Sequence, residues 1–343
     1  MSIDDFFAYA RARHAIYLRR KAGEEPPWTD DAALGLYRFT NVFRELDRTT
    51  IWFRENVRER VDGPEALLAA VVFRWFNRIQ TGEAIFRQPM LTRGNCTAFE
   101  RLVNFTDGVD AMRESIIAYC GKGPYTTGSY IISSPQGYGK LDGVLECLRQ
   151  FMDTEQPALW DGEARTIGWR EFAEVMLANR GMFTLEFTWR WLRQHYFMGD
   201  FMAYEVVSDL RHTALLDKAP DITTWANPGP GAARGAGRIW HGNQYHFNKH
   251  GDKLVLNAHM QELLALSRDA GLWPQPGRVP KGYDGSYFVS GYIRQEIENV
   301  PGAFDAGAWP AWEMREVEHT LCEFDKYERT HLGEGRPRGV YGR

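Results

Sequence analysis

The stretch that decides the fold is Trp191-Leu-Arg-Gln-His-Tyr-Phe-Met-Gly199-Asp-Phe-Met-Ala203-Tyr-Glu-Val-Val-Ser-Asp209-Leu. An aromatic-rich helix runs into a short turn that contains Gly199, and a second helix follows at once. The small residue Ala203 allows close packing of that second helix. Backbone N–H groups at such a turn can hold a phosphate group, and glycine permits both close approach and an unusual φ. The alternative is a plain helical hairpin with a glycine at the end of its first helix.

This hairpin resembles the helix-hairpin-helix of base-excision DNA glycosylases. In that family a Leu-Pro-Gly-Val-Gly-like turn precedes a helix with a small residue at its fourth step. Only Gly199 and Ala203 match, since Phe197 and Asp200 stand where Gly and Pro are usual. A catalytic Asp follows the hairpin in those enzymes, at the start of the next helix. Asp221 stands at a comparable distance, and its alternative role is a simple helix N-cap.

A second informative stretch is Asn227-Pro-Gly229-Pro-Gly231-Ala-Ala-Arg234-Gly-Ala-Gly-Arg238-Ile. It is a loop that feeds the N-terminus of a Gly/Ala-rich helix with two arginines. Such a helix start lets an anion come close, and a phosphate or pyrophosphate is a natural occupant. The candidate substrate-binding residues are therefore Asn227, Gly229, Gly231 and Arg234. The alternative is tight helix packing through small residues.

Most of the remaining chain shows helical periodicity. The predicted helices are residues 32–61, 65–79, 108–119, 141–151, 169–178, 185–196, 257–270 and 312–331. Strand signals are few and short, at residues 130–132, 254–256 and 287–289. We therefore predict a mainly α fold, a helix-hairpin-helix DNA-glycosylase-like helical domain with a few short strands. Residues 1–343 form one domain in this prediction, with the hairpin core at about 185–240.

Composition limits the function classes. The net charge is −4 and the pI is near 6.2, so no overall basic field indicates nucleic acid, and local arginines would have to bind it. The four cysteines are scattered without a C-x-x-C pair, which favours a reducing compartment over disulfides or structural zinc. No signal peptide or long apolar run is present, so we expect a cytoplasmic protein without a membrane partner.

Charged residues on two early helices are candidate DNA contacts. Arg44 and Arg48 share a stripe of the helix predicted at 32–61. Asn77 and Arg78 stand with Arg74 on an otherwise apolar helix, where unpaired charge would be costly. Arg74, Asn77 and Arg78 should reach either acidic partners or DNA phosphates.

The last predicted helix carries a second set of polar residues. Glu318, Cys322, Asp325 and Arg329 fall on one face, and His319, Glu323 and Lys326 lie beside them. This stripe could form a pocket for an amino-acid substrate, with Lys326 or Arg329 binding its carboxylate. The alternative is a solvated, salt-bridged helix.

Three stretches together resemble one family: Arg38-Phe-Thr-Asn41-Val-Phe-Arg44-Glu-Leu-Asp47-Arg48, the 199–239 segment, and the ending that runs from Met314 to Arg329. The family is that of the alpha-glutamyl/putrescinyl-thymine pyrophosphorylases, or amino acid:DNA transferases. It includes the helical domain that accompanies 5-hydroxymethyl-deoxyuridine DNA kinases. The chain contains no Gly-x-x-x-x-Gly-Lys-Ser/Thr motif, which favours transferase over kinase chemistry.

The resemblance implies thymine hypermodification in bacteriophage DNA. A kinase activates 5-hydroxymethyluracil as a pyrophosphate ester, and the transferase replaces pyrophosphate with the amine of an amino acid or polyamine. The implied partners are double-stranded DNA with the activated base flipped from the stack, the amine donor, and functionally the kinase. The location would be the cytoplasm of the infected bacterial host. No firm cofactor is implied, although acidic surroundings permit Mg²⁺ with the pyrophosphate.

Four residues are candidate catalytic groups: Asp209, Asp221, Glu318 and Lys326. Pyrophosphate needs cations or N–H groups, and the incoming amine needs a base. His319, Glu323 and Arg329 are assigned to substrate binding. The alternative role of Asp209 is a salt bridge with Arg211 or His212. No metal site is predicted, because the three histidines at 241, 246 and 250 lack acids at ligand spacing other than Asp252.

Two other functions are compatible with the sequence. A DNA glycosylase would use Asp221 to stabilise an oxocarbenium-like sugar and would leave abasic sites. A non-catalytic DNA-binding module would serve a separate 5-hydroxymethyluracil DNA kinase.

Overall fold

The computed structural model describes residues 1–90, 94–160, 162–269, 271–274, 300, 302–303, 305 and 307–341. Helices make up 54% of the structure, well above the roughly 30–35% of average globular proteins, so the mainly α prediction is confirmed. The chain forms two compact units. Unit 1 comprises Met1–Asp47 and Thr223–Arg343, and unit 2 is Arg48–Ile222. Because a compact unit need not fold alone, the single domain stays a prediction.

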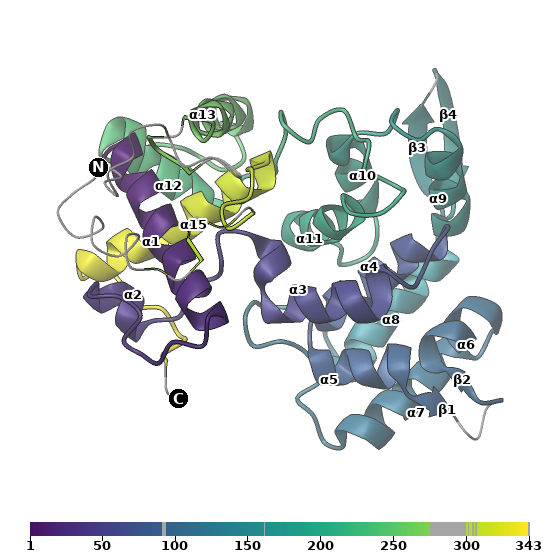
Figure 1. Cartoon of the computed structure of the whole chain (residues 1–343). Helices are drawn as coiled ribbons and strands as arrows, with labels where there is room; N and C mark the ends of the chain where they lie inside the picture. Colours follow the sequence, from purple (N-terminus) through teal and green to yellow (C-terminus); the bar gives the residue numbers. More distant parts are fainter. Residues whose placement is uncertain are drawn as a thin grey trace. The chain divides into compact units, whose positions relative to one another are not determined.

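Unit 1 is built around its last helix, α15. The elements of unit 1 are α1 (Ile3–Lys21), α2 (Ala32–Leu36), the 3₁₀ turn η1 (Arg44–Leu46), α12 (Pro230–His241), α13 (Lys253–Leu266) and α15 (Met314–His331). Helix α15 packs against α1, α2, α12 and α13, and it runs beside α12 in Figure 1. Two segments from opposite ends of the sequence therefore share one core.

Helix α1 was not predicted from the sequence. It begins at a capping box formed by Ser2 and Asp5, which is a recognisable helix start. Its middle is buried on nearly every side, arginines included, so no amphipathic stripe marks it. Burial among helices distant in sequence, rather than one apolar face, stabilises this helix.

The predicted helix at 32–61 is wrong as one continuous element. Helix α2 starts at its N-cap Asp31 and ends at Leu36. The next residue, Tyr37, is extended and forms an isolated bridge with Val340. Hydrogen bonds to the C-terminal segment thus replace helical ones, and the helix resumes only at α3 (Arg48–Phe53).

Unit 2 surrounds one buried helix, α4. Its elements are α3, η2 (Arg54–Arg58), α4 (Glu65–Phe76), α5 (Ile79–Gly82), η3 (Glu83–Arg87), β1 (Pro89–Met90), β2 (Cys96–Thr97), α6 (Ala98–Asn104), α7 (Gly108–Cys120), α8 (Lys140–Asp153), β3 (Gln156–Trp160), β4 (Glu163–Ile167), α9 (Trp169–Ala178), α10 (Leu185–Leu192) and α11 (Asp200–Leu210). Helix α4 packs against α5, α8, α9 and α11, as its apolar sequence predicts. It ends three residues before the prediction, because Asn77 adopts a left-handed conformation with φ 44°.

The other predicted helices agree with the structure to within a few residues, whereas α5 and α6 were not predicted. The predicted strands do not agree with the structure. The described residues at 130–132 form no strand, and residues 254–256 lie inside α13, so both strand predictions are wrong. The strand predicted at 287–289 lies outside the described residues. The hairpin of β3 and β4 was missed, although Asp161-Gly162 between Trp160 and Glu163 is a typical hairpin dipeptide.

Helices α10 and α11 form the predicted hairpin. Gly199 is the N-cap of α11 and has an ordinary φ of −71°, whereas Phe197 in the same turn has φ 57°. A Cβ at Gly199 would meet nothing within 4 Å. Backbone strain therefore does not explain Gly199, contrary to the expectation of an unusual φ. The kinship of this hairpin with the glycosylase motif stays a prediction.

Candidate functional site

The segment 39–47 of unit 1 is fixed by partly buried polar contacts at Asn41. The Asn41 side-chain amide donates to the Leu46 carbonyl (2.9 Å) and to Oδ1 of Asp47 (2.9 Å). Its Oδ1 accepts from Nη2 of Arg13 on α1 (2.6 Å). Burial raises the pKa of Asp47, which its contacts to Arg44 and the Asn41 backbone oppose. Side chains thus satisfy the polar groups of a segment that is mostly not helical.

His319 of α15 contacts this segment through a hydrogen bond. Its Nε2 lies 3.1 Å from the Asn41 carbonyl oxygen, which can only accept, so Nε2 carries the proton and Nδ1 is the acceptor nitrogen. Burial lowers the pKa of His319 well below its ordinary value, and the charges of Arg44, Arg315 and Lys326 lower it further. The ring is therefore neutral at neutral pH and lies in a positive local field.

Each of the three cations also faces one carboxylate. The pairs are Arg44–Asp47 (4.0 Å), Arg315–Glu45 (3.8 Å) and Lys326–Glu323. We call these six residues, with His319 and Asn41, the His319 cluster. Glu323 also accepts from the Thr40 backbone N–H (3.0 Å), so it fastens α15 to the 39–47 segment. Two stretches that lie far apart in the sequence thus meet in one polar site.

The start of α12 is packed against α15. Oε1 of Glu318 accepts from the Gly229 N–H (3.0 Å), which already places a carboxylate at this helix N-terminus. A Cβ on Gly231 would overlap the Cys322 side chain, and one on Gly235 would overlap the Leu321 carbonyl oxygen. The packing interpretation of these small residues is therefore confirmed, and a ligand has no space above Gly231. The Asn227 side chain accepts from Lys253 (2.9 Å).

Three arginines converge on Asp325, which is fully buried. Arg234 Nε lies 2.7 Å from Oδ2, Arg238 Nε lies 3.0 Å from Oδ1, and Arg329 Nε lies 3.2 Å from Oδ2. The Arg234 and Arg329 side chains keep about a third of their surface exposed, while Arg238 is buried and also binds Glu334. The arginines assigned to pyrophosphate or carboxylate binding are therefore held first by an internal carboxylate.

In unit 2, Asp209 belongs to a buried ion-pair network. Both of its carboxylate oxygens accept from Arg74, at 2.5 and 2.6 Å. Arg74 also donates to Glu205 (3.2 Å) and to Asn77 Oδ1 (3.2 Å). The pKa of Arg74 is raised, since the attraction of Asp209 and Glu205 outweighs the opposing effect of burial. Arg74 thus has the acidic partners that the sequence allowed, whereas Asp209 pairs with Arg74 rather than with Arg211 or His212.

The remaining predicted residues of unit 2 lie at separate points. Asp221 accepts from the backbone N–H groups of Leu185 (2.7 Å) and Glu186 (3.0 Å), so it caps α10 from a distance in sequence. Burial raises the pKa of Asp221, and these hydrogen bonds oppose that effect. Arg48 is exposed at the start of α3, and Arg78 donates to Gln80.

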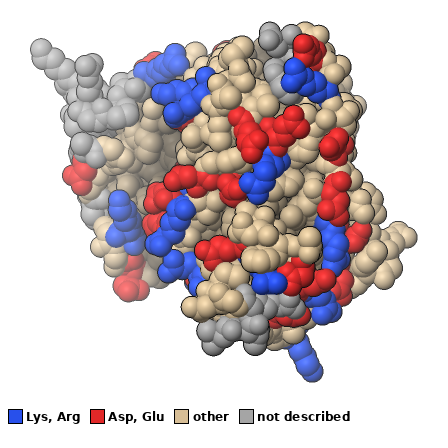
Figure 2. Space-filling view, turned by 90° about the vertical axis from the view of Figure 1, so that its right-hand side faces the viewer, with Lys and Arg blue, Asp and Glu red and all other residues tan. Residues whose placement is uncertain are grey.

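Charge on the face shown in Figure 2 is mixed. Basic and acidic side chains alternate there, and no single basic patch dominates. Unit 2 contains exposed ion pairs of this kind, such as Arg113–Asp142 and Arg149–Asp110. A DNA-binding surface on this face would therefore rest on a few local contacts rather than on a broad positive field.

Sequence reasoning missed two arginines at this site. Arg315 belongs to the His319 cluster, and Arg13 binds its Asn41. Arg13 is only 4% exposed, although it stands in the basic run Arg11-Ala-Arg13-His14 of α1. A buried cation needs a partner, so the reasoning that marked Arg74 could have marked Arg13 as well.

Among the described residues, no three His, Cys, Asp or Glu side chains are placed to hold a metal ion. No helix in the described part of the chain has the length and hydropathy needed to cross a membrane.

Glu316, at the start of α15, should make the free energy of unfolding depend on pH. Its side chain accepts from the Glu313 N–H (3.0 Å), and burial raises its pKa from 4.5 to about 7. The folded state then holds a proton between these pH values that the unfolded state releases, so the free energy of unfolding falls as pH rises through this window. Glu316→Gln should remove this loss and stabilise the protein above pH 7 by at most about 3 kcal/mol.

Denaturant unfolding of both proteins at several pH values measures this difference. The two curves should converge near the low end of the window, and the exposed Glu59→Gln should leave the wild-type dependence intact. A constant offset between Glu316→Gln and the wild type at every pH would contradict the prediction.

The chain matches a known protein family. Residues 1–269 match the family described as the helical domain of 5-hmdU DNA kinase. A 5-hmdU DNA kinase of Bacillus phage SP10 is 34% identical over 88 residues, which is 24% of this chain and 14% of that protein. The chain thus matches only a small part of this curated relative, and no solved structure matches it. Because the family match covers well over half of the sequence, the chain belongs to the family of the 5-hmdU DNA kinase helical domain.

Proposed function

We propose that this chain acts in the hypermodification of 5-hydroxymethyluracil in DNA, as a transferase. In the proposed reaction, the nitrogen of an amino acid or polyamine attacks the methylene carbon of the activated base. A C–N bond forms, the C–O bond to pyrophosphate breaks, and the amine loses one proton. Membership of the kinase helical-domain family supports the substrate base, and the lack of a phosphate-binding Gly-Lys-Ser/Thr loop favours a transfer step.

The observation that carries the proposal is a neutral histidine among cations. Nδ1 of His319 is an acceptor nitrogen because Nε2–H is committed to Asn41. A proton acceptor beside Arg44, Arg315 and Lys326 matches a reaction that takes a proton from an amine and releases a highly charged anion. Leaving pyrophosphate would be stabilised by these cations.

Binding of the activated substrate would also change the pKa of His319. An anion beside the cations offsets their charge, so it should raise the pKa of His319 toward its ordinary value. A histidine with a higher pKa is a stronger proton acceptor. His319 would therefore become an effective base only when the activated base is in place, which would limit transfer to the correct complex.

Nucleoside mass spectrometry tests the proposal. DNA that contains 5-hydroxymethyluracil is incubated with a 5-hydroxymethyluracil DNA kinase, ATP, this protein and a panel of amino acids and polyamines. We expect a new nucleoside whose mass equals that of the hydroxymethyl nucleoside plus the donor minus water. Intact DNA with no adduct from any donor would defeat the proposal, and abasic sites would indicate a glycosylase instead.

A further inference from the structure

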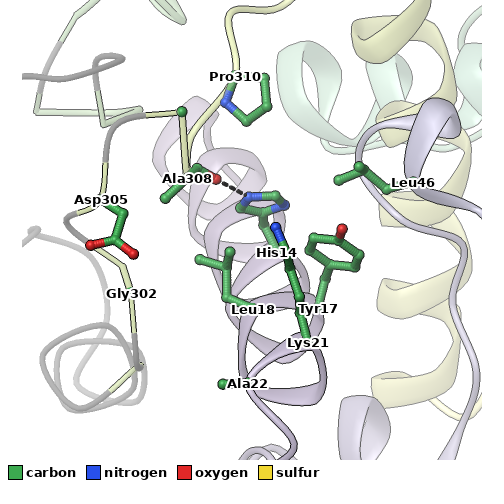
Figure 3. A pocket seen from close by; sticks show the side chains of 11 residues that line it. His14, Tyr17, Leu18, Lys21, Ala22, Leu46, Gly302, Asp305, Ala308 and Pro310 are labelled. Carbon is green, nitrogen blue, oxygen red and sulfur yellow. Dashed lines mark hydrogen bonds between the residues drawn. The ribbon is translucent and has the colours of Figure 1, made fainter.

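Unit 1 contains a cavity of about 450 Å³ beside α1, within the range of roughly 300–1,000 Å³ that holds small molecules. The described residues that line it are His14, Tyr17, Leu18, Lys21, Ala22, Leu46, Gly302, Asp305, Gly307, Ala308 and Pro310. Figure 3 shows residues of α1 on one side of this cavity, with Gly302 and Asp305 opposite them. The His319 cluster does not use these side chains.

His14 supplies a buried acceptor in the cavity wall. It is 1% exposed, and its Nε2 lies 2.6 Å from the Ala308 carbonyl oxygen, so Nε2 carries the proton. Burial lowers the pKa of His14 to about 4, which keeps the ring neutral. Nδ1 has no hydrogen-bond partner among the described residues, and a buried polar atom without a partner is energetically unfavourable. A ligand that donates an N–H would satisfy it.

The two charged residues of the cavity have opposite signs. Lys21 runs along α1 toward His14, while Asp305 belongs to the opposite wall (Figure 3). Neither forms an ion pair with another described residue. A zwitterion can pair with both charges. A polyamine would be repelled by Lys21, and a simple carboxylate would face Asp305 without compensation.

The cavity is structurally tied to the His319 cluster. Leu46 lines the cavity, and its carbonyl oxygen accepts from the Asn41 side chain (2.9 Å). On α1, His14 faces the cavity and the adjacent Arg13 binds Asn41. The 39–47 segment therefore contributes to both sites, and α1 lines the cavity while its Arg13 binds Asn41 of the cluster.

We infer that this cavity binds a free amino acid, with its carboxylate at Lys21 and its ammonium group at His14 and Asp305. This inference rests on the proposed transferase, and it selects an amino acid rather than a polyamine as the amine donor. Ion-pair recognition at both ends would leave the donor's side chain to the rest of the cavity.

Isothermal titration calorimetry on the whole chain, without DNA or kinase, tests the site. The probes are the standard amino acids, with acetate, methylamine and putrescine as comparators. We expect at least one amino acid to bind more tightly than every comparator. Lys21→Met and Asp305→Asn should each weaken that binding by about tenfold, the loss of roughly one charged hydrogen bond. Lys249→Met, outside the cavity lining, is the matched control.

Tighter binding of putrescine, or unchanged amino-acid binding by both variants, would overturn the inference. The readout separates the two proposals. Amino-acid binding that needs Lys21 and Asp305, without any DNA adduct, would support this site and defeat the transferase. Adduct formation with a donor KM unchanged by both variants would support the transferase and defeat this site.

Discussion

Asp209→Asn is expected to lower the free energy of unfolding by about 3–5 kcal/mol. The Arg74 and Asp209 side chains are 1% and 0% exposed and are joined by two short hydrogen bonds. Asparagine keeps the shape of Asp209 but removes its charge, so Arg74 would keep Glu205 as its one remaining carboxylate partner at 3.2 Å. A buried guanidinium that loses its two shortest hydrogen bonds to a carboxylate, and keeps only one longer contact to Glu205, is costly because the interior has a low dielectric. Guanidinium unfolding midpoints measure the change.

Two further variants test the physical cause of this loss. The combined variant Arg74→Met, Glu205→Leu and Asp209→Leu replaces the ion pairs with apolar side chains and should recover most of the stability. Asp142→Asn disrupts an exposed ion pair with Arg113 and should shift the midpoint only slightly. A wild-type midpoint for Asp209→Asn would contradict a buried pair. Any loss of activity in Asp209 variants must therefore be compared per folded molecule before Asp209 is assigned a catalytic role.

His319→Gln is expected to lower the transfer rate at saturating substrate by about 10²- to 10⁴-fold, the usual contribution of a positioned general base. Glutamine can still donate to the Asn41 carbonyl, so the fold of the 39–47 segment should persist. It cannot accept a proton from the amine. The wild-type rate should rise with pH as His319 becomes neutral in the substrate complex, and the variant should lose that rise. Initial rates of adduct formation across pH measure both effects.

His331→Gln is the matched control on the same helix. His331 lies 3.4 Å from Asp31 with its side chain largely exposed, outside the His319 cluster. This variant should transfer at the wild-type rate. If His319→Gln also kept the wild-type rate and pH profile, His319 would not be the base. A melting temperature equal to that of the wild type would exclude unfolding as the cause of a lost rate.

The sequence indicated several residues of the His319 cluster, but not that they lie close together in space. The polar stripe of the last helix was visible, because His319, Glu323 and Lys326 fall at helical spacing. Arg44 was also visible, but it was placed on a continuous helix and assigned to DNA. Its proximity to His319 depends on the break after Leu36, which hydrogen bonds to the C-terminal segment produce. Sequence periodicity carries no information about contacts of that range.

The sequence by itself determined the mainly helical class, the buried helix α4, the hairpin of α10 and α11, and the polar face of α15. These features depend on local spacing and turn residues, which act over a few positions. The tertiary structure alone decided what the charged residues contact. In the structure Asp209 forms an ion pair with Arg74, and Asp325 forms ion pairs with three arginines. Asp221 accepts hydrogen bonds from the N–H groups at the start of α10. The physical reason is that a buried charge is stabilised by its nearest partner in space, and chain folding rather than sequence spacing selects that partner.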